Sequence, residues 1–485
     1  MRRVWIGLGL VVLSGVVYFV MTVQVGGASG WVSPVEAHNE AIGLVDIDDR
    51  AYPLLAEFFA RTAAGSMPFT IGEVSPGDEG WDEVAAWVES EEAQGLIALL
   101  EEASGRLILG MPLLDYEDSI WVDAMGSVGI WVVDESRVGV GETALMLNAL
   151  LPMSGTIVRA GKALEADAFA AVEAGDGDRF VRDVQVWSRL ALMADEPNVM
   201  IGQLVGVVQL WQINRLIGEV LIEHPGLIDE EVGAQLEGVY QSVMEADVFS
   251  MNLDLEYATL EDVLRRLVDD AGQYDAAQTL AFIPMIGDDE GEGIMFDPSS
   301  ALLEDIDADL IAGYIHYQAI GQARVDAAVM PWREVEAIAD DESWSDGITS
   351  PQGEIGKLMY SVLTLDDEQL DSAVSMFRTR HQEFIGVRVA LAAHRHRVRH
   401  GEPAMELAGI DNDLLGFEAA DGFTGGVVQY RWVDGAALVY ALGADGDDDG
   451  GVGVAVPEGV DGYLISDEYL KAKWDGDMVL FPDSD

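Results

Sequence analysis

The feature that most constrains this chain is an uncharged apolar run close to its N-terminus. The segment from Val4 to Val25 has 22 residues and no charged side chain. At about 1.5 Å of rise per residue, a helix of this length crosses a hydrocarbon core of about 30 Å. We therefore predict a cytoplasmic stub at residues 1–3 and a transmembrane anchor at residues 4–25.

The charges that flank this run predict its orientation. Arg2 and Arg3 precede it, and the first charged residue after it is Glu36. Because basic flanking residues stay on the cytoplasmic side, we expect a single-pass protein with the bulk of the chain outside the cytoplasm. A cleaved signal peptide is the alternative, since residues 26–28 are small, but the apolar run is longer than the core of such peptides.

The composition excludes several classes of function. The chain has 87 acidic residues against 26 lysines and arginines, a formal net charge of -61, which excludes nucleic-acid binding by charge. Hydrophobic residues make up 49% of the chain, so packed cores are expected. The absence of cysteine excludes disulfides and thiolate metal sites. Acid excess with few lysines indicates a salt-adapted surface, and we expect the exported part to lose stability at low ionic strength.

Helical periodicity dominates the middle of the chain and predicts a mainly α fold. Residues 26–142 are expected to be helical or mixed α/β, and residues 143–286 to form a helical domain. An acidic linker at 287–299 and a helical region at 300–380 are expected to follow. The helices predicted before the linker lie at 52–62, 81–103, 156–174, 178–194, 199–223, 229–245 and 258–270, with Asp178 and Asn198 as N-caps.

The uncharged stretch at 198–214 is nearly long enough to be taken for a second membrane span. Three glutamines, Gln203, Gln209 and Gln212, make it too polar for a hydrocarbon environment. We predict a buried helix here instead.

The C-terminal part of the chain carries the most specific pattern. A helix predicted over 366–400 has a basic end and meets a stop signal at Gly401. Two apolar, β-prone runs at 427–433 and 436–442 are separated by an Asp-Gly pair, which predicts a β-hairpin. An acidic loop at 443–451 follows, and the chain finishes with a short apolar strand preceded by acids.

This order of elements resembles the C-terminal domain of the major pseudopilin of type II secretion, over residues 381–485. The resemblance implies a small α+β module with an antiparallel hairpin. It also implies a calcium ion that pins the acidic loop to the sheet. The ligands expected from the resemblance are Asp445, Asp447, Asp449 and Asp477. The segment at 452–474 is longer than expected of that family, and the module's helix is not contiguous with the anchor.

The chemistry of the acidic loop supports calcium independently. Calcium takes about six to eight oxygen ligands, and the carboxylates of residues 445 and 447–449 repel one another unless a cation neutralises them. The loop matches the first half of an EF-hand, but Val456 stands where the bidentate glutamate should be. The alternative is a solvated acidic turn.

The basic end of the 366–400 helix contains a second candidate. His396 and His400 lie four residues apart, so they can bind a metal from one helix face, although no H-E-x-x-H motif is present. The simpler interpretation is that a basic helix end in an acidic chain pairs with acidic neighbours and complements the helix dipole. We favour the simpler interpretation.

Catalytic motifs are missing from the sequence. It has no G-x-S-x-G elbow, no Walker-type loop and no dinucleotide-binding glycine motif between a strand and a helix. Enzyme activity is therefore not favoured, although an envelope hydrolase with an unrecognised carboxylate site is the alternative. A true pseudopilus component is disfavoured, because no acid lies between Met1 and Gln24, where pilin processing needs a glutamate.

The whole chain also resembles a group of uncharacterised bacterial membrane-anchored proteins, which implies no activity. Together these features predict a mainly α protein with an N-terminal transmembrane helix, an extracytoplasmic helical body and a small C-terminal α+β module. We expect an extracytoplasmic scaffold or interaction protein of the bacterial inner membrane with a structural calcium site. Its expected partners are the membrane, through the anchor, and other envelope proteins, but not nucleic acid.

Overall fold

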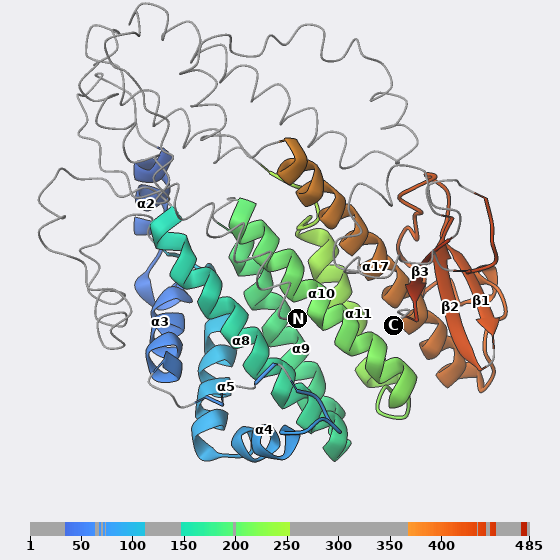
Figure 1. Ribbon diagram of the computed structural model, residues 1–485, viewed down its shortest axis with the longest axis horizontal. Helices are drawn as coiled ribbons and strands as arrows, with labels where there is room; N and C mark the ends of the chain where they lie inside the picture. Colours follow the sequence, from blue (N-terminus) through green and yellow to red (C-terminus); the bar gives the residue numbers. More distant parts are fainter. Residues whose placement is uncertain are drawn as a thin grey trace, which may run out of the picture.

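The computed structural model describes residues 34–252 and 367–482, except for gaps at 64–66, 69–70, 73, 112–146, 197–199, 434, 443–446 and 453–476. Within these ranges the protein is mainly helical, with one small antiparallel sheet near the C-terminus. Figure 1 shows the central helices side by side, with the sheet at one end of the row. The predicted anchor, the acidic linker and most of the helical region at 300–380 lie outside the described residues.

The N-terminal part of the described chain, residues 34–104, contains five helical elements. It contains α2 (Pro34–Gly43), the short helix η1 (Ile47–Asp49), α3 (Tyr52–Arg61), α4 (Trp81–Val88) and α5 (Glu91–Ser104). The single helix predicted at 81–103 is wrong, because Ser90 interrupts it. The Ser90 hydroxyl accepts a hydrogen bond from the backbone N–H of Ala93 and caps a new helix, α5.

The central body confirms most of the predicted helices. The body consists of α8 (Leu147–Ala174), α9 (Gly177–Asp195), α10 (Met200–Glu223) and α11 (Glu230–Glu245). α9 packs against the other three, and α3, α4 and α5 all lie against α8. The predicted N-cap of α9 is wrong. Asp176, not Asp178, accepts the backbone N–H of Arg179, because α9 begins one residue earlier than expected. Asn198 lies outside the described residues.

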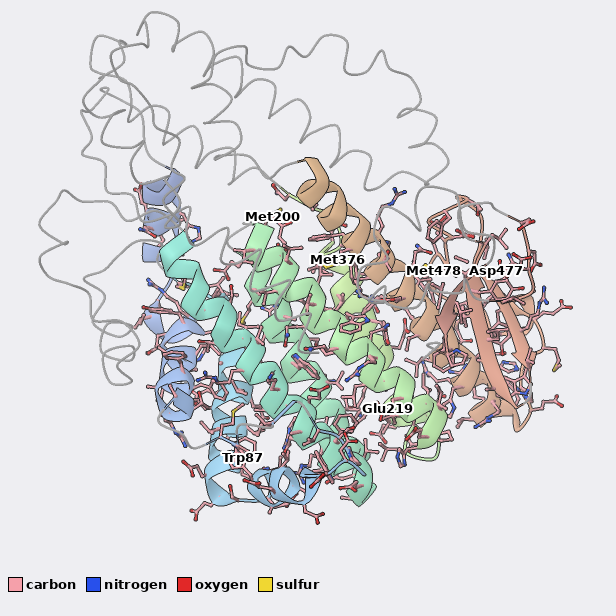
Figure 2. The ribbon with its side chains drawn as sticks, in the orientation of Figure 1. Trp87, Met200, Glu219, Met376, Asp477 and Met478 are labelled. Atoms are coloured by element: carbon pink, nitrogen blue, oxygen red, sulfur yellow. The ribbon has the colours of Figure 1, made fainter. Side chains whose placement is uncertain are left out.

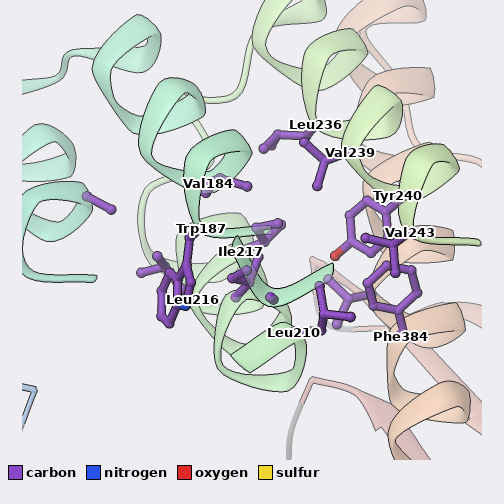
Figure 3. Packing of buried hydrophobic residues seen from close by; sticks show 14 of the residues in the cluster. Val184, Trp187, Leu210, Leu216, Ile217, Leu236, Val239, Tyr240, Val243 and Phe384 are labelled. Atoms are coloured by element: carbon purple, nitrogen blue, oxygen red, sulfur yellow. The ribbon is translucent and has the colours of Figure 1, made fainter. Parts of the chain in front are cut away.

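α10 is the buried helix that the sequence predicts. Its two buried glutamines have partners within the protein: Gln209 accepts a hydrogen bond from the Trp187 indole at 2.8 Å, and Gln203 donates to a backbone carbonyl at 2.6 Å. Figure 3 shows apolar side chains of α10 meeting Trp187 of α9 on one side. None of the helices in the described ranges is long and apolar enough to span a bilayer.

The C-terminal region forms a helix and a three-stranded sheet. α17 (Asp367–His400) ends at Gly401, which adopts φ +75° and donates its N–H to the Arg397 carbonyl. β1 (Gln429–Val433), β2 (Ala436–Ala441) and β3 (Met478–Phe481) pair antiparallel in the order β1-β2-β3. The hairpin and the final strand are therefore confirmed.

α17 joins the sheet to the helical body. It packs against α10 and α11 on one side and against β2 and β3 on the other. Gly386 permits the close approach to β3, since a Cβ at this position would lie 2.3 Å from the Cβ of Leu480. Toward the body, the rings of Phe384 and Tyr240 lie 4.5 Å apart (Figure 3). The sheet and the helices therefore share one hydrophobic core, and α17 runs across the domain boundary predicted at residue 381.

Candidate metal site at the C-terminal sheet

Asp477 is a buried acid at the start of β3 (Figure 2). Its side chain has no exposed surface, and Oδ2 accepts a hydrogen bond of 2.7 Å from the backbone N–H of Gly451. The other carboxylate oxygen, Oδ1, is buried and has no hydrogen-bond donor among the described residues. A buried carboxylate with one oxygen unsatisfied is costly unless a cation or a proton compensates it.

The acidic loop folds back over the sheet and brings further carboxylates to Asp477. Gly450 and Gly451 adopt φ +78° and +82°, a conformation that favours glycine, and this turn carries the chain from Asp449 back to the sheet. Asp447, Asp448 and Asp449 are exposed on the loop. The loop therefore presents three acids beside one buried carboxylate.

Asp448 has partners of its own within the protein. It accepts hydrogen bonds from the Tyr440 hydroxyl at 2.9 Å, the Gly450 N–H at 2.9 Å and the Arg431 guanidinium at 3.0 Å. Burial opposes its ionisation, but these three donors hold the pKa of Asp448 below its usual value. Asp448 thus serves as a structural anchor of the loop.

The electrostatics of Asp477 run in the opposite direction. Burial raises the pKa of the Asp477 carboxyl, and the negative charges of Asp448 and Asp449 raise it further. The backbone N–H groups of Gly451 and Asp449 act in the other direction, but the pKa stays above its ordinary value. The carboxylates around Asp477 therefore favour the arrival of a proton or of a cation.

The predicted ligands fall into two groups. Asp477 and Asp449 are brought close enough to interact electrostatically, and Asp447 lies on the same loop. Asp445 lies outside the described residues. Arg431 and Tyr440 are partners of the loop that the sequence does not predict. The hairpin register contains a signal for them, because Arg431 pairs with Leu438 and Gln429 with Tyr440, which places both side chains on one face.

A second buried acid in the same module shows that burial alone does not create a site. Asp421 accepts three backbone hydrogen bonds, from Phe423 at 2.8 Å, Thr424 at 3.1 Å and Leu442 at 2.9 Å. Both of its oxygens are therefore satisfied by the chain. The unsatisfied oxygen of Asp477 distinguishes the two positions.

The helical body contains a buried carboxyl pair, Asp167 and Asp183, that bears on the hydrolase alternative. Asp167 pairs with Arg179 at 2.7 Å and Arg182 at 2.6 Å, and Asp183 pairs with Arg182 at 2.6 Å. Burial, the hydrogen bond with Asp167 and its charge raise the pKa of Asp183 to about 9, so this residue is protonated at neutral pH. Both acids are fully buried and compensated by the two arginines, an arrangement suited to structure.

Other proteins give no guidance on this site. Comparison of the chain with models of known families, with curated proteins and with solved structures found no match in any of the three.

Proposed function

We propose that this protein is a single-pass, membrane-anchored scaffold or interaction protein of a bacterial envelope, with a structural calcium ion in its C-terminal α+β module. The observation that carries the proposal is the buried Oδ1 of Asp477, which meets no donor from the described parts of the chain. The anchor at 4–25 holds the protein in the inner membrane, and the helical body and the sheet lie outside the cytoplasm.

A calcium ion supplies what this carboxylate lacks. Calcium binds carboxylate and carbonyl oxygens in a flexible geometry, which suits a loop that turns on two glycines. Asp477 provides the ligand on the sheet, and Asp445, Asp447 and Asp449 provide the ligands on the loop. Asp448 keeps its hydrogen bonds with Arg431 and Tyr440, so it orients the loop without binding the ion.

The exposed position of the loop acids fits an exported protein. Calcium sites of extracellular modules have dissociation constants of about 0.1 to 1 mM, and such weak sites are filled only where calcium is abundant. Exposed loop acids such as Asp447 and Asp449 beside the buried Asp477 form a site of this kind.

A calcium ion bound between the loop and β3 would make the C-terminal module more rigid, and a rigid surface suits the binding of partner proteins. The ion would tie the loop at 447–452 to β3, and β3 packs on α17, which continues into the shared core with α10 and α11. The module is thereby a rigid end of the helical body. The hydrolase alternative has no comparable support, since the Asp167–Asp183 pair is enclosed by its own arginines.

The location is tested by expressing the full chain in a bacterial host. We expect it in the membrane fraction, and in spheroplasts we expect externally added protease to digest the bulk of the chain. A variant without residues 4–25 should leave the membrane fraction. A chain that resists external protease in intact spheroplasts but is digested after lysis would contradict the proposed orientation.

The calcium clamp is tested on the same membranes. We expect calcium to slow the proteolysis of the C-terminal module relative to a chelator, and Asp477→Asn to abolish this protection. Asp421→Asn is the matched control, because it changes a buried acid of the same module that already has its donors. Calcium protection that survives in Asp477→Asn would contradict the proposed clamp.

A further inference from the structure

The basic end of α17 meets acidic neighbours, as the simpler interpretation of its sequence predicts. Arg399 pairs with Glu230 at 2.7 Å and with Asp413 at 2.8 Å, and Arg395 pairs with Glu230 at 2.9 Å. His394 points into the body, where its Nε2 lies 2.7 Å from the backbone oxygen of Ile228. Arg397 lies over the Trp432 ring, 5.5 Å from its centroid. These contacts account for the three arginines and for one histidine of the segment.

The two remaining histidines converge on a single carboxylate. His396 and His400 lie on one face of α17 with ring centroids 4.5 Å apart, and the chain after Gly401 returns to place Asp411 beside both rings. Nε2 of His400 lies 2.9 Å from Oδ2 of Asp411, and Nδ1 of His396 lies 3.4 Å from Oδ1. One donor atom from each residue falls within 4.8 Å of the other two.

His396 has a weaker contact with the carboxylate than His400 has, because its Nδ1 lies 3.4 Å from Oδ1 of Asp411. Its side chain is 12% exposed, and Nδ1 is buried with no hydrogen-bond partner in the part of the chain that the structure describes. A buried imidazole nitrogen usually finds a hydrogen bond or a metal. Here it is directed at a carboxylate oxygen that lies too far away for a good hydrogen bond.

We propose that His396, His400 and Asp411 form a binding site for a divalent first-row transition metal, with zinc as the expected ion. Two imidazole nitrogens and one carboxylate are ligands that zinc prefers, whereas calcium requires oxygen ligands. Ligand atoms about 2.0 Å from a tetrahedral zinc ion lie roughly 3.3 Å apart. The 3.4 Å distance from Nδ1 of His396 to Oδ1 of Asp411 already matches this value. His400 now contacts the other oxygen, Oδ2, at 2.9 Å, so its ring would turn from that contact toward the ion.

The charged surroundings are compatible with a dication. Arg399 is a cation in contact with the cluster, and its Nη1 lies 3.3 Å from Oδ2 of Asp411, so Oδ1 is the oxygen available to the metal. Glu230 and Asp413 offset the charge of Arg399. Three protein ligands leave a fourth position for water, and His400 is 47% exposed, so this position faces solvent. The metal would staple the end of α17 to the segment at 401–413.

The site is tested by titrating the purified full chain, in detergent and molar KCl, with Co²⁺ as a spectroscopic probe. Calcium is kept in excess so that the carboxylate site near Asp477 is saturated. We expect one saturable absorption change of the tetrahedral Co²⁺ type, reversed by Zn²⁺. His396→Ala and Asp411→Asn should weaken binding on the order of tenfold or more. His224→Ala removes an exposed histidine outside the cluster and should bind as the wild type does.

A third variant separates loss of binding from loss of folding. His400 is the most exposed of the three ligands, so His400→Ala should keep the native melting temperature without metal. It should also lose the zinc-induced rise in melting temperature seen for the wild type. The proposal is overturned if the wild type shows no saturable Co²⁺ spectrum. It is equally overturned if all three variants bind Co²⁺ with wild-type affinity.

Discussion

Asp183 in the helical body and Asp477 at the sheet are both fully buried acids, but they are compensated in different ways. Asp183 contacts Arg182 and shares a hydrogen bond with Asp167, which is itself held by Arg179 and Arg182. Asp477 is surrounded by acids, and one of its oxygens is left without a donor by the residues that the structure places.

This difference shows which group compensates the charge of each buried carboxylate. A buried carboxylate is tolerated when an opposite charge, a proton or a full set of hydrogen bonds accompanies it. The body carries its own cations, and the raised pKa of Asp183 means that this carboxyl keeps its proton at neutral pH. The buried Oδ2 of Asp183, which like Oδ1 of Asp477 meets no donor among the described residues, therefore carries no uncompensated charge. The sheet lacks such a set at Asp477, and in the proposed function an ion from the surroundings supplies it.

The largest effect is expected from breaking the internal network. Arg179→Gln leaves Asp167 with one arginine instead of two, and removing one partner of a buried pair costs about 3 kcal/mol or more. We expect this loss in the free energy of unfolding by urea, both with and without calcium. Arg61→Gln, which alters an exposed pair with Glu57, is the control and should change little. A loss that calcium restores would contradict the separation of the two regions.

Calcium binding should give the next largest effect. At a concentration about 100 times its dissociation constant, a ligand specific for the native state stabilises it by about 2.7 kcal/mol. We expect Asp477→Asn to remove this gain and to be no less stable than the wild type in chelator, because it removes an uncompensated buried charge. Asp421→Asn should be destabilised in both conditions but retain the calcium gain. Thermal melting at fixed high ionic strength compares each variant with the wild type, once in calcium and once in chelator.

The protonated Asp183 predicts a dependence of stability on pH. Its pKa is raised in the folded state to about 9, whereas the unfolded carboxyl ionises near its ordinary value. Between these two values the native state binds more protons, so stability falls as pH rises, by at most about 1.4 kcal/mol per pH unit. Asp183→Asn cannot ionise and should lose less stability than the wild type between pH 6 and about pH 9. Parallel profiles for the two proteins in urea unfolding would contradict the protonated state.

The smallest effect is expected at the edge of the proposed calcium site. Arg431 and Asp448 are both nearly half exposed, so Arg431→Gln should cost less than about 1 kcal/mol of stability in chelator. Because the substitution removes a cation from beside the loop, the calcium affinity should rise. A fall in affinity would show that Arg431 orients the ligands more than it competes with the ion.

Local signals in the sequence predicted the hairpin and the central helices well. An Asp-Gly pair between two β-prone runs specifies a turn within a few residues, and α8 to α11 each carry strong helical periodicity. The break at Ser90 was missed because the periodicity continues through it, although serine is a good N-cap. The cap of α9 was misplaced by two residues for a related reason, since Asp176 and Asp178 are both good caps.

The sites themselves depend on contacts that one sequence does not specify. Asp477 is buried because β3 pairs with β2 and because Gly451 turns its N–H toward the carboxylate, both long-range events. Asp411 joins the His396–His400 pair only because the chain folds back after Gly401. The ligand types are visible in the sequence, but their meeting points are properties of the fold.

The most direct test of the account is a calorimetric calcium titration of the full chain, of Asp477→Asn and of Asp183→Asn at fixed high ionic strength. The account predicts a saturable binding event in the wild type and in Asp183→Asn, and its loss in Asp477→Asn. Saturable binding that persists unchanged in Asp477→Asn, or that is absent from the wild type, would contradict it.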